Sequence, residues 1–303
     1  MIRFRRLSRP RRRDGGYVTV VVLTFAGLMA ALVAATLNVA RPSVGQALVN
    51  IDDMQADGLL EAGISTAGLA LYSANRPVQS IDGFAVPLET GAIRLTIKAE
   101  AGRIDINAAR PEMLSGIYAA AGTGALKPSE FAALVLDWRD RNSRVRPGGA
   151  EREEYAALGL DHRPRDGPFL SLEELLLLPG MTQEDYQRLL PYLTVFNPLG
   201  DIDPGSAEMP VLLSVPNMSE SEALGIRSAF NSPDSTQRER NQLIRPYQRY
   251  LTADGSDVFR VLVEARLNNG YTKSVEAVLM PGFRRIPYHV LYWRVLDPPE
   301  VPS

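Results

Sequence analysis

A charge-free apolar run near the N-terminus constrains the fold of this chain more than any other feature. No charged residue occurs from Gly15 to Ala40, and Arg41 is the first one after that run. As a helix rising ~1.5 Å per residue, residues 17–40 would extend about 36 Å. That length crosses the ~30 Å hydrocarbon core of a bilayer with some tilt. We therefore expect residues 17–41 to form the transmembrane part of a helix.

The charge distribution gives that helix a direction. Residues 1–16 contain seven Arg and one Asp, so residues 17–303 carry −8 of a total net charge of −2. Because basic residues favour the cytoplasmic side, the N-terminus should be cytoplasmic and the body should lie across the membrane. An acidic body argues against nucleic acid as the main partner. The chain contains no Cys, which excludes disulfides, thiolate metal ligands and a cysteine nucleophile.

The junction RRRDGG–YVTVVV is compatible with three kinds of processing. A secretory signal would be cut after the apolar run, but ATLNVARPS is a poor match to such a site. An uncleaved signal anchor is the second alternative. The third is a cut between the basic and apolar parts, because a short basic stretch ending in Gly resembles a prepilin leader. That resemblance implies prepilin peptidase cleavage after Gly16, with Tyr17 as the new N-terminus.

One position departs from the usual pilin pattern. Pilin-like proteins usually carry Glu at the fifth mature position, and Val21 stands there in this chain. A carboxylate within the bilayer is costly unless it is paired. Val21 therefore favours a subunit at the end of an assembly, with no neighbour above it to supply a pairing amine.

The helix is expected to continue beyond the membrane, over roughly residues 17–75. Pro42 is a potential kink, and Pro77 ends the pattern. Two separate helices are the alternative. Apolar residues continue at helical spacing in Leu48, Ile51, Leu59, Ala62 and Leu69.

Predicted strands flank a long helical middle. Residues 93–98 alternate apolar and polar side chains, and GRIDIN adds a short strand. Near the C-terminus, two apolar runs surround Asn269-Gly270, a strong hairpin signal, and YHVLYWRVL is a further strand. A sheet divided by helical residues 105–245 predicts a helical insertion in a pilin-like sheet. Three domains in series are the alternative.

Two short segments within the helical middle share one plan, Pro179–Thr182 and Pro216–Ser219. Gly180 and Asn217 suit a left-handed helix end, and Thr182 and Ser219 suit the N-cap of the next helix. The plan predicts two helix-hairpin-helix (SAM-like) units. Such units often bind DNA through backbone N–H groups, so a membrane-anchored DNA-binding receptor of a DNA-uptake system is the alternative function. The net charge of −4 over residues 105–200 argues against a phosphate-binding surface.

An acidic loop in the same block suggests a metal. Hard oxygen ligands around Pro147, Gly148 and Gly149 suit Ca²⁺, and the lack of nearby His or Cys disfavours zinc. The alternative is a solvated loop neutralised by Arg139, Arg141 and Arg144. The candidate ligands are Asp137, Asp140, Asn142, Glu151, Glu153 and Glu154.

Catalysis finds little support in the sequence. The two histidines are far apart, and no nucleophile elbow or Gly-rich phosphate loop occurs. The acidic pair Glu173-Glu174 is expected on a solvated helix face. We therefore expect a protein that is not an enzyme.

Several motifs together resemble the K-type minor pseudopilins of type II secretion, the GspK family. The resemblance rests on DWRDRN…GGAEREEY, on GPFLSLEELLLLPGMTQEDYQRLLPYLTVF, on GRIDIN and on the lack of Glu at Val21. It implies an α+β, type IV pilin-like fold with a long N-terminal helix, an antiparallel sheet and a large helical insertion. The expected parts are leader 1–16, transmembrane helix 17–41, first pseudopilin part 42–104, insertion 105–245 and C-terminal strands 246–303.

The resemblance also implies a function. The chain would be a non-catalytic subunit, processed by prepilin peptidase with methylation, in the inner membrane with a periplasmic body. It would sit at the pseudopilus tip with the I- and J-type minor pseudopilins, followed by the H- and G-type pseudopilins, and promote assembly and protein export. The family is thought to hold calcium in the insertion, which implies Asp137, Asp140 and Glu151 as ligands. Asn142 stands where Asp is usual, and Glu154 is added for its position.

Overall fold

The structure is a computed structural model that describes residues 15–296, except for the side chains of residues 15–19 and 33–50. The chain divides into two compact units, residues 1–57 and residues 58–303. Helix α1 (Gly15–Tyr72) contributes to both units. Its bounds confirm the helix expected over residues 17–75, and the helix includes Pro42. Within the described part of the chain, no helix is long and apolar enough to cross a membrane.

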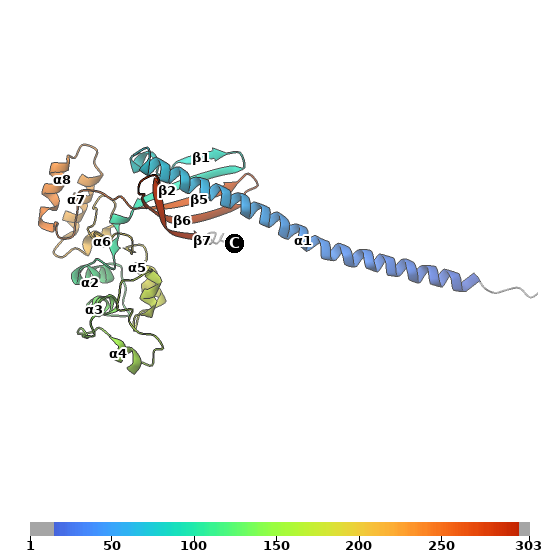
Figure 1. Ribbon diagram of the computed structural model, residues 1–303, viewed down its shortest axis with the longest axis horizontal. Helices are drawn as coiled ribbons and strands as arrows, with labels where there is room; N and C mark the ends of the chain where they lie inside the picture. Colours follow the sequence, from blue (N-terminus) through green and yellow to red (C-terminus); the bar gives the residue numbers. More distant parts are fainter. Residues whose placement is uncertain (1–14, 297–303) are drawn as a thin grey trace, which may run out of the picture. The chain divides into compact units, whose positions relative to one another are not determined.

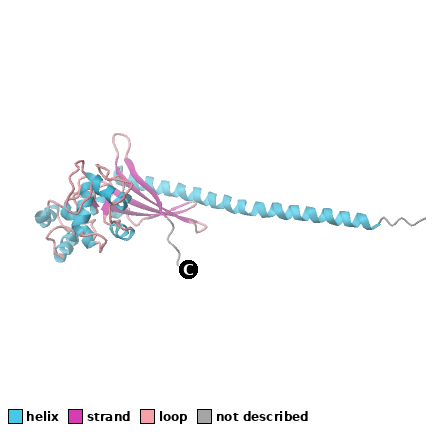
Figure 2. Ribbon diagram, turned by 90° about the horizontal axis from the view of Figure 1, so that it is seen from below, coloured by secondary structure: helices cyan, strands magenta, loops and turns pink. Residues whose placement is uncertain are grey.

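A five-stranded antiparallel sheet belongs to the second unit, and Figure 2 draws its strands in magenta. Its strand order is β1-β2-β5-β6-β7, so the two N-terminal strands pair with three strands from the far end of the sequence. Gly270 adopts φ 91° in the β5–β6 turn, which confirms the hairpin at Asn269-Gly270. The strands are β1 (Ala85–Leu88), β2 (Gly91–Ala99), β5 (Phe259–Leu267), β6 (Thr272–Pro281) and β7 (Tyr288–Leu296).

The last turns of α1 cover one face of this sheet. Leu60 and Ile64 are buried against Val263 and Val275 of the sheet. Gly63 lies so close to Val263 that a Cβ there would overlap the valine side chain. The helix can therefore pack directly on the strand, and the alternation predicted for residues 93–98 places Ile93, Leu95 and Ile97 in this core.

The helical middle packs around a second core, separate from the first (Figure 1). Its largest buried side chains include Tyr118, Phe131 and Tyr155. Two short parallel strands, β3 (Ile104–Asp105) and β4 (Leu193–Thr194), pair within it. The helices are α2 (Pro111–Ala120), α3 (Pro128–Arg139), α4 (Arg152–Ala157), α5 (Gln183–Leu189), α6 (Met209–Leu213), α7 (Glu220–Asn231) and α8 (Gln237–Ile244), and the 3-10 turns of the chain are η1 (Val78–Ser80), η2 (Glu100–Gly102), η3 (Leu172–Leu177) and η4 (Arg245–Tyr247).

The expected hairpins lie where short helices meet. Gly180 has φ 79° and Asn217 has φ 62°, so both adopt left-handed geometry, in the turns that connect η3 to α5 and α6 to α7. The hydroxyl of Thr182 accepts the backbone N–H of Asp185, and that of Ser219 accepts the N–H of Glu222. The caps are confirmed, and the assignment of these turns to helix-hairpin-helix units stays a prediction.

Candidate functional site

The predicted cleavage site, Gly16 and Tyr17, belongs to the part of α1 whose side chains are not described. Helix α1 includes both residues. Residues 1–14 of the predicted leader lie outside the described residues. Cleavage after Gly16 therefore stays a prediction.

The acidic loop connects the end of α3 to the start of α4, and it brings three of the predicted ligands together. Asp137 is in the last turn of α3, Asp140 follows that helix, and Glu151 is the N-cap of α4. Asp137 is fully buried, and Glu151 is only 5% exposed. The alternative of a solvated charged loop is therefore wrong for these two carboxylates.

An arginine that sequence reasoning missed bridges two of these carboxylates. Nη1 of Arg146 lies 2.5 Å from Oδ1 of Asp137 and 2.5 Å from Oδ2 of Asp140. The backbone N–H of Arg146 also donates to Asp137. By contrast, Arg139 donates to the backbone carbonyls of Ile106 and Ala109, so it does not neutralise the loop as expected.

The third carboxylate, that of Glu151, lacks a partner for one of its oxygens. Its Oε1 atom is buried and accepts no hydrogen bond. Burial first, then the charges of Asp137, Asp140 and Asp166, raise the pKa of Glu151 to about 7, against the opposing effect of Arg146. An acceptor oxygen without a donor, held among other carboxylates, is a place where a cation would be stabilised.

The loop backbone is shaped to approach this cluster closely. Gly148 has φ 82°, a conformation that favours glycine. A Cβ on Gly149 would overlap Oδ2 of Asp137. These glycines let the chain turn directly over the buried aspartate.

Of the other three predicted ligands, Glu153 is exposed, and Asn142 and Glu154 make hydrogen bonds within the loop. The Asn142 amide donates to Oδ1 of Asp140 at 2.7 Å, and its Oδ1 accepts the N–H of Arg144. The Glu154 carboxylate accepts the backbone N–H of Glu151 at 2.9 Å and so caps α4.

The oxygen donors of this cluster are of the type that a hard cation prefers, but they are not arranged around a cation position. Across the described residues, no three His, Cys, Asp or Glu side chains are arranged to hold a metal ion. Arg146 occupies one oxygen of each aspartate. The buried free oxygen of Glu151 and the two aspartates are nevertheless the oxygen donors that Ca²⁺ prefers, so the chemistry of the donor set fits calcium.

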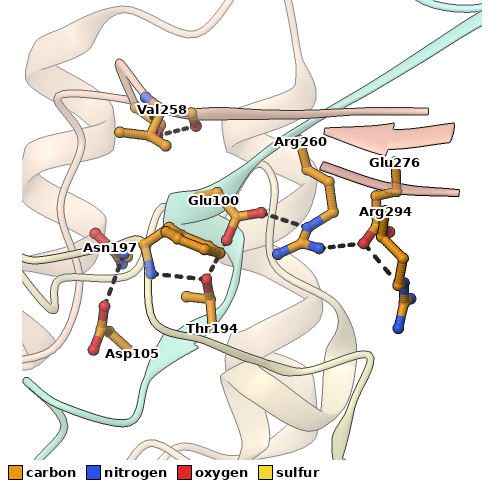
Figure 3. Close-up of polar contacts among 10 residues, drawn as sticks. Glu100, Asp105, Thr194, Asn197, Val258, Arg260, Glu276 and Arg294 are labelled. Carbon is orange, nitrogen blue, oxygen red and sulfur yellow. Dashed lines mark hydrogen bonds and ion pairs between the residues drawn. The ribbon is translucent and has the colours of Figure 1, made fainter. Parts of the chain in front are cut away.

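A second polar cluster, not anticipated from the sequence, ties the helical middle to the sheet (Figure 3). The fully buried carboxylate of Glu100 accepts Nε of Arg260 at 2.6 Å and the hydroxyl of Thr194. Nη1 of Arg260 also donates to Glu276 at 2.5 Å. Burial lowers the pKa of Arg260, but Glu100 and Glu276 raise it more, so the guanidinium stays charged.

Buried or half-buried polar side chains also connect sequence motifs to one another through hydrogen bonds. Asn107, from GRIDIN, donates to the Phe169 carbonyl and accepts the Phe169 N–H, which joins it to GPF. Glu174 is nearly buried and receives a two-pronged contact from Arg165, 2.6 and 2.8 Å, as well as the indole N–H of Trp138. Glu174 therefore does not lie on a solvated face, and that expectation is wrong for this residue.

Comparisons with known proteins identify these motifs. A family model described as Type II secretion system (T2SS), protein K matches residues 96–198, which include the acidic loop. Type II secretion system protein K of Pseudomonas aeruginosa is 24% identical over 194 residues, covering 59% of this chain and 58% of its own length. The protein K of Klebsiella pneumoniae is 36% identical over 72 residues, covering 24% of this chain and 22% of its own. The chain thus spans less than two thirds of these relatives.

A solved structure shares the fold. It is the crystal structure of the GspK-GspI-GspJ complex from the type 2 secretion system of enterotoxigenic Escherichia coli. The match has a TM-score of 0.59 and 17% identity, and covers 84% of this chain and 99% of that one. The mixed helical and antiparallel architecture is therefore that of a known fold. Profile, relatives and fold therefore agree that this chain resembles type II secretion system protein K, with residues 96–198 matching the model of that family.

Proposed function

We propose that this chain is a non-catalytic minor pseudopilin at the tip of a type II secretion pseudopilus, where it promotes assembly and protein export. The observation that carries the proposal is the fold match, which extends over nearly the whole of a chain solved in complex with GspI and GspJ. The partners are I- and J-type minor pseudopilins, followed by H- and G-type pseudopilins below them.

The N-terminal segment supports an anchored subunit that ends a fibre. Within residues 20–32, apolar side chains such as Leu23 and Leu28 are 71% and 69% exposed, which suits contact with lipid. The Arg-rich leader puts the N-terminus in the cytoplasm and the body in the periplasm, with one pass through the inner membrane. Val21 needs no pairing amine from a subunit above it.

The DNA-receptor alternative is less well supported. DNA-binding hairpins offer free N–H groups at a helix start to a phosphate. Here the side chains of Thr182 and Ser219 already take one such N–H each, and both following helices carry two acidic residues in the first turn. Those carboxylates would repel a phosphate backbone.

The test follows the protein through its processing. We expect intact-mass and N-terminal analysis of the membrane-extracted chain to give Tyr17 as the first residue only when prepilin peptidase is present. We also expect co-purification with I- and J-type subunits from the same system. Retention of Met1, or a cut after residue 40, would contradict a pseudopilin. Purified chain that retains double-stranded DNA at 150 mM salt would favour the receptor instead.

We further propose that Asp137, Asp140 and Glu151 bind structural calcium. Bound Ca²⁺ would neutralise the carboxylates around the free oxygen of Glu151, and Arg146 supplies the positive charge without the ion. Calorimetric titration of chelator-treated full chain should show saturable Ca²⁺ binding that Glu151→Gln weakens strongly. Glu153→Gln, on the same helix start, is the matched control. Equal binding by both variants would contradict this ligand set.

A further inference from the structure

A small cavity lies beside the polar cluster of Figure 3, where the helical middle meets the sheet. Its volume is about 290 Å³. Three arginines from separate parts of the chain line it: Arg103 after η2, Arg260 on β5 and Arg294 on β7. Tyr292 and the exposed Glu173 also contribute to its wall. We call this cavity the arginine pocket.

The three arginines differ in how well their charges are compensated. Arg260 is saturated, because Glu100 and Glu276 both accept from it at hydrogen-bond distance. Figure 3 shows Glu276 between Arg260 and Arg294, yet Nη2 of Arg294 is 3.8 Å from that carboxylate, beyond hydrogen-bond reach. The Nε atom of Arg294 is buried without any acceptor.

Arg103 is the second donor with unused capacity. Among residues 58–296, no carboxylate lies within ion-pair distance of its guanidinium. Burial lowers the pKa of Arg103, and the neighbouring charge of Arg260 lowers it further. Arg103 is half-buried, and guanidinium groups withdrawn from water are normally paired and hydrogen-bonded, so this side of the pocket offers donors to an incoming acceptor.

We propose that the arginine pocket binds a carboxylate, held by Arg103 and Arg294 and assisted by the hydroxyl of Tyr292. A planar, singly charged carboxylate matches the two-pronged donor face of a guanidinium. A phosphate dianion fits less well, because Glu276 and Glu173 add negative charge to the same wall. The volume is at the lower limit of small-molecule sites, so it takes one acidic side chain or a small acid.

The proposal does not depend on the role in the pseudopilus. The carboxylate can come from an acidic residue of a protein segment or from a free small acid, and the chemistry is the same. Because Tyr292 and Arg294 lie on β7, at one edge of the described sheet, the pocket is within reach of an extended chain that approaches that edge. Probes of the two kinds separate the two sources.

The experiment uses the full chain in detergent and an NMR readout of arginine Nε–H signals. The probe is N-acetyl-glutamate amide, with N-acetyl-glutamine amide and inorganic phosphate as comparisons. We expect saturable shifts of the Arg294 signal with the glutamate probe alone. Loss of a charged hydrogen bond should weaken binding about tenfold or more in Arg103→Gln and in Arg294→Gln.

Matched variants keep the result interpretable. Arg163→Gln changes an exposed arginine elsewhere and should bind like the wild type. Arg294→Lys keeps the charge but loses the planar fork, so it should bind more weakly while folding normally. A seven-residue peptide with a central Glu that binds more tightly than the single amino acid identifies a protein source, and equal or weaker binding identifies a small acid.

Three results would overturn the proposal. One is that the folded wild-type chain shows no saturable shift with the glutamate probe. Another is equal binding of the glutamine probe or of phosphate. The last is unchanged affinity in both Arg103→Gln and Arg294→Gln when their unfolding midpoints match that of the wild type.

Discussion

The pairing of Glu100 with Arg260 predicts a large and specific effect of a single substitution. The side chain of Glu100 is fully buried, and that of Arg260 is only 11% exposed. Arg260→Met removes the charge but keeps much of the volume. It leaves the Glu100 carboxylate in the interior with only Thr194 as a donor, and leaves Glu276 without its nearest cation.

The magnitude follows from the cost of an unpaired buried charge. Removing one partner of a buried pair destabilises a protein by about 3–5 kcal/mol. For a unit of 150–250 residues, each kcal/mol shifts the unfolding midpoint by roughly 2–4 °C. Because the unit that contains the pair spans residues 58–303, we expect Arg260→Met to lower the midpoint by about 6–20 °C.

Two further variants isolate the pair itself. In Glu100→Gln/Arg260→Met the buried anion is gone and the amide still accepts from Thr194, so a large part of the loss should be recovered. The control is Arg94→Met, since Arg94 and Glu264 form an exposed pair on the same sheet at 3.9 Å. That pair should contribute less than about 1 kcal/mol.

Thermal and urea unfolding of the full chain in detergent, followed by circular dichroism, measure these differences. A loss in Arg260→Met no larger than in Arg94→Met would refute the reasoning. Failure of the double variant to recover stability would show that Arg260 matters through its packing rather than its charge.

Three further predictions concern the acidic loop and one helix cap. In calcium-free buffer, Glu151→Gln should equal the wild type in stability near pH 4.5 and exceed it by up to about 3 kcal/mol above pH 7. The sign follows because the pKa of Glu151 in the folded protein, about 7, lies above its ordinary value of 4.5. The wild type therefore loses stability as the pH rises between these two values. Urea titrations across that pH range measure the difference. Gly149→Ala should lower stability by about 1–3 kcal/mol, because the new methyl group meets Asp137, and an unchanged urea midpoint would contradict that overlap. Thr182→Ala should lower the free energy of unfolding by about 0.5–2 kcal/mol through the lost N-cap, which the same unfolding curves measure, whereas Thr182→Ser should retain most of it.

Local signals predicted most of the regular structure. The helix from Gly15 to Tyr72 and the hairpin at Gly270 depend on periodicity and turn chemistry within a short stretch, which a sequence displays directly. The strands β1 and β4 were not predicted. β4 has only two residues, and its pairing with β3 is set by the packing of the helical middle, so no local pattern could show it.

The candidate site was predictable in its residue types but not in its charge balance. Asp137, Asp140 and Glu151 were predicted as ligands because acidic residues cluster in one loop and because the resemblance to the GspK family selects these three, and their role as ligands stays a prediction. Arg146 was missed, since its two carboxylate contacts require the loop to close over the end of α3. Glu174 was wrongly predicted to be solvated for a related reason. The spacing of residues along its own helix cannot show that Arg165, from a neighbouring loop, forms an ion pair with it.

Two carboxylate pairs in this chain are each bridged by one arginine, and the exposure of that arginine distinguishes their roles. Arg260 is only 11% exposed and makes hydrogen-bonded ion pairs with both Glu100 and Glu276, so its charge is a fixed part of the structure. Arg146 is 36% exposed, and water can solvate its guanidinium if it leaves Asp137. Exchange of Arg146 for a divalent cation therefore costs far less desolvation than loss of Arg260 would. On the proposal made above, the acidic loop would therefore be the place where an ion binds and dissociates, while the cluster around Arg260 would hold the helical middle on the sheet in either state.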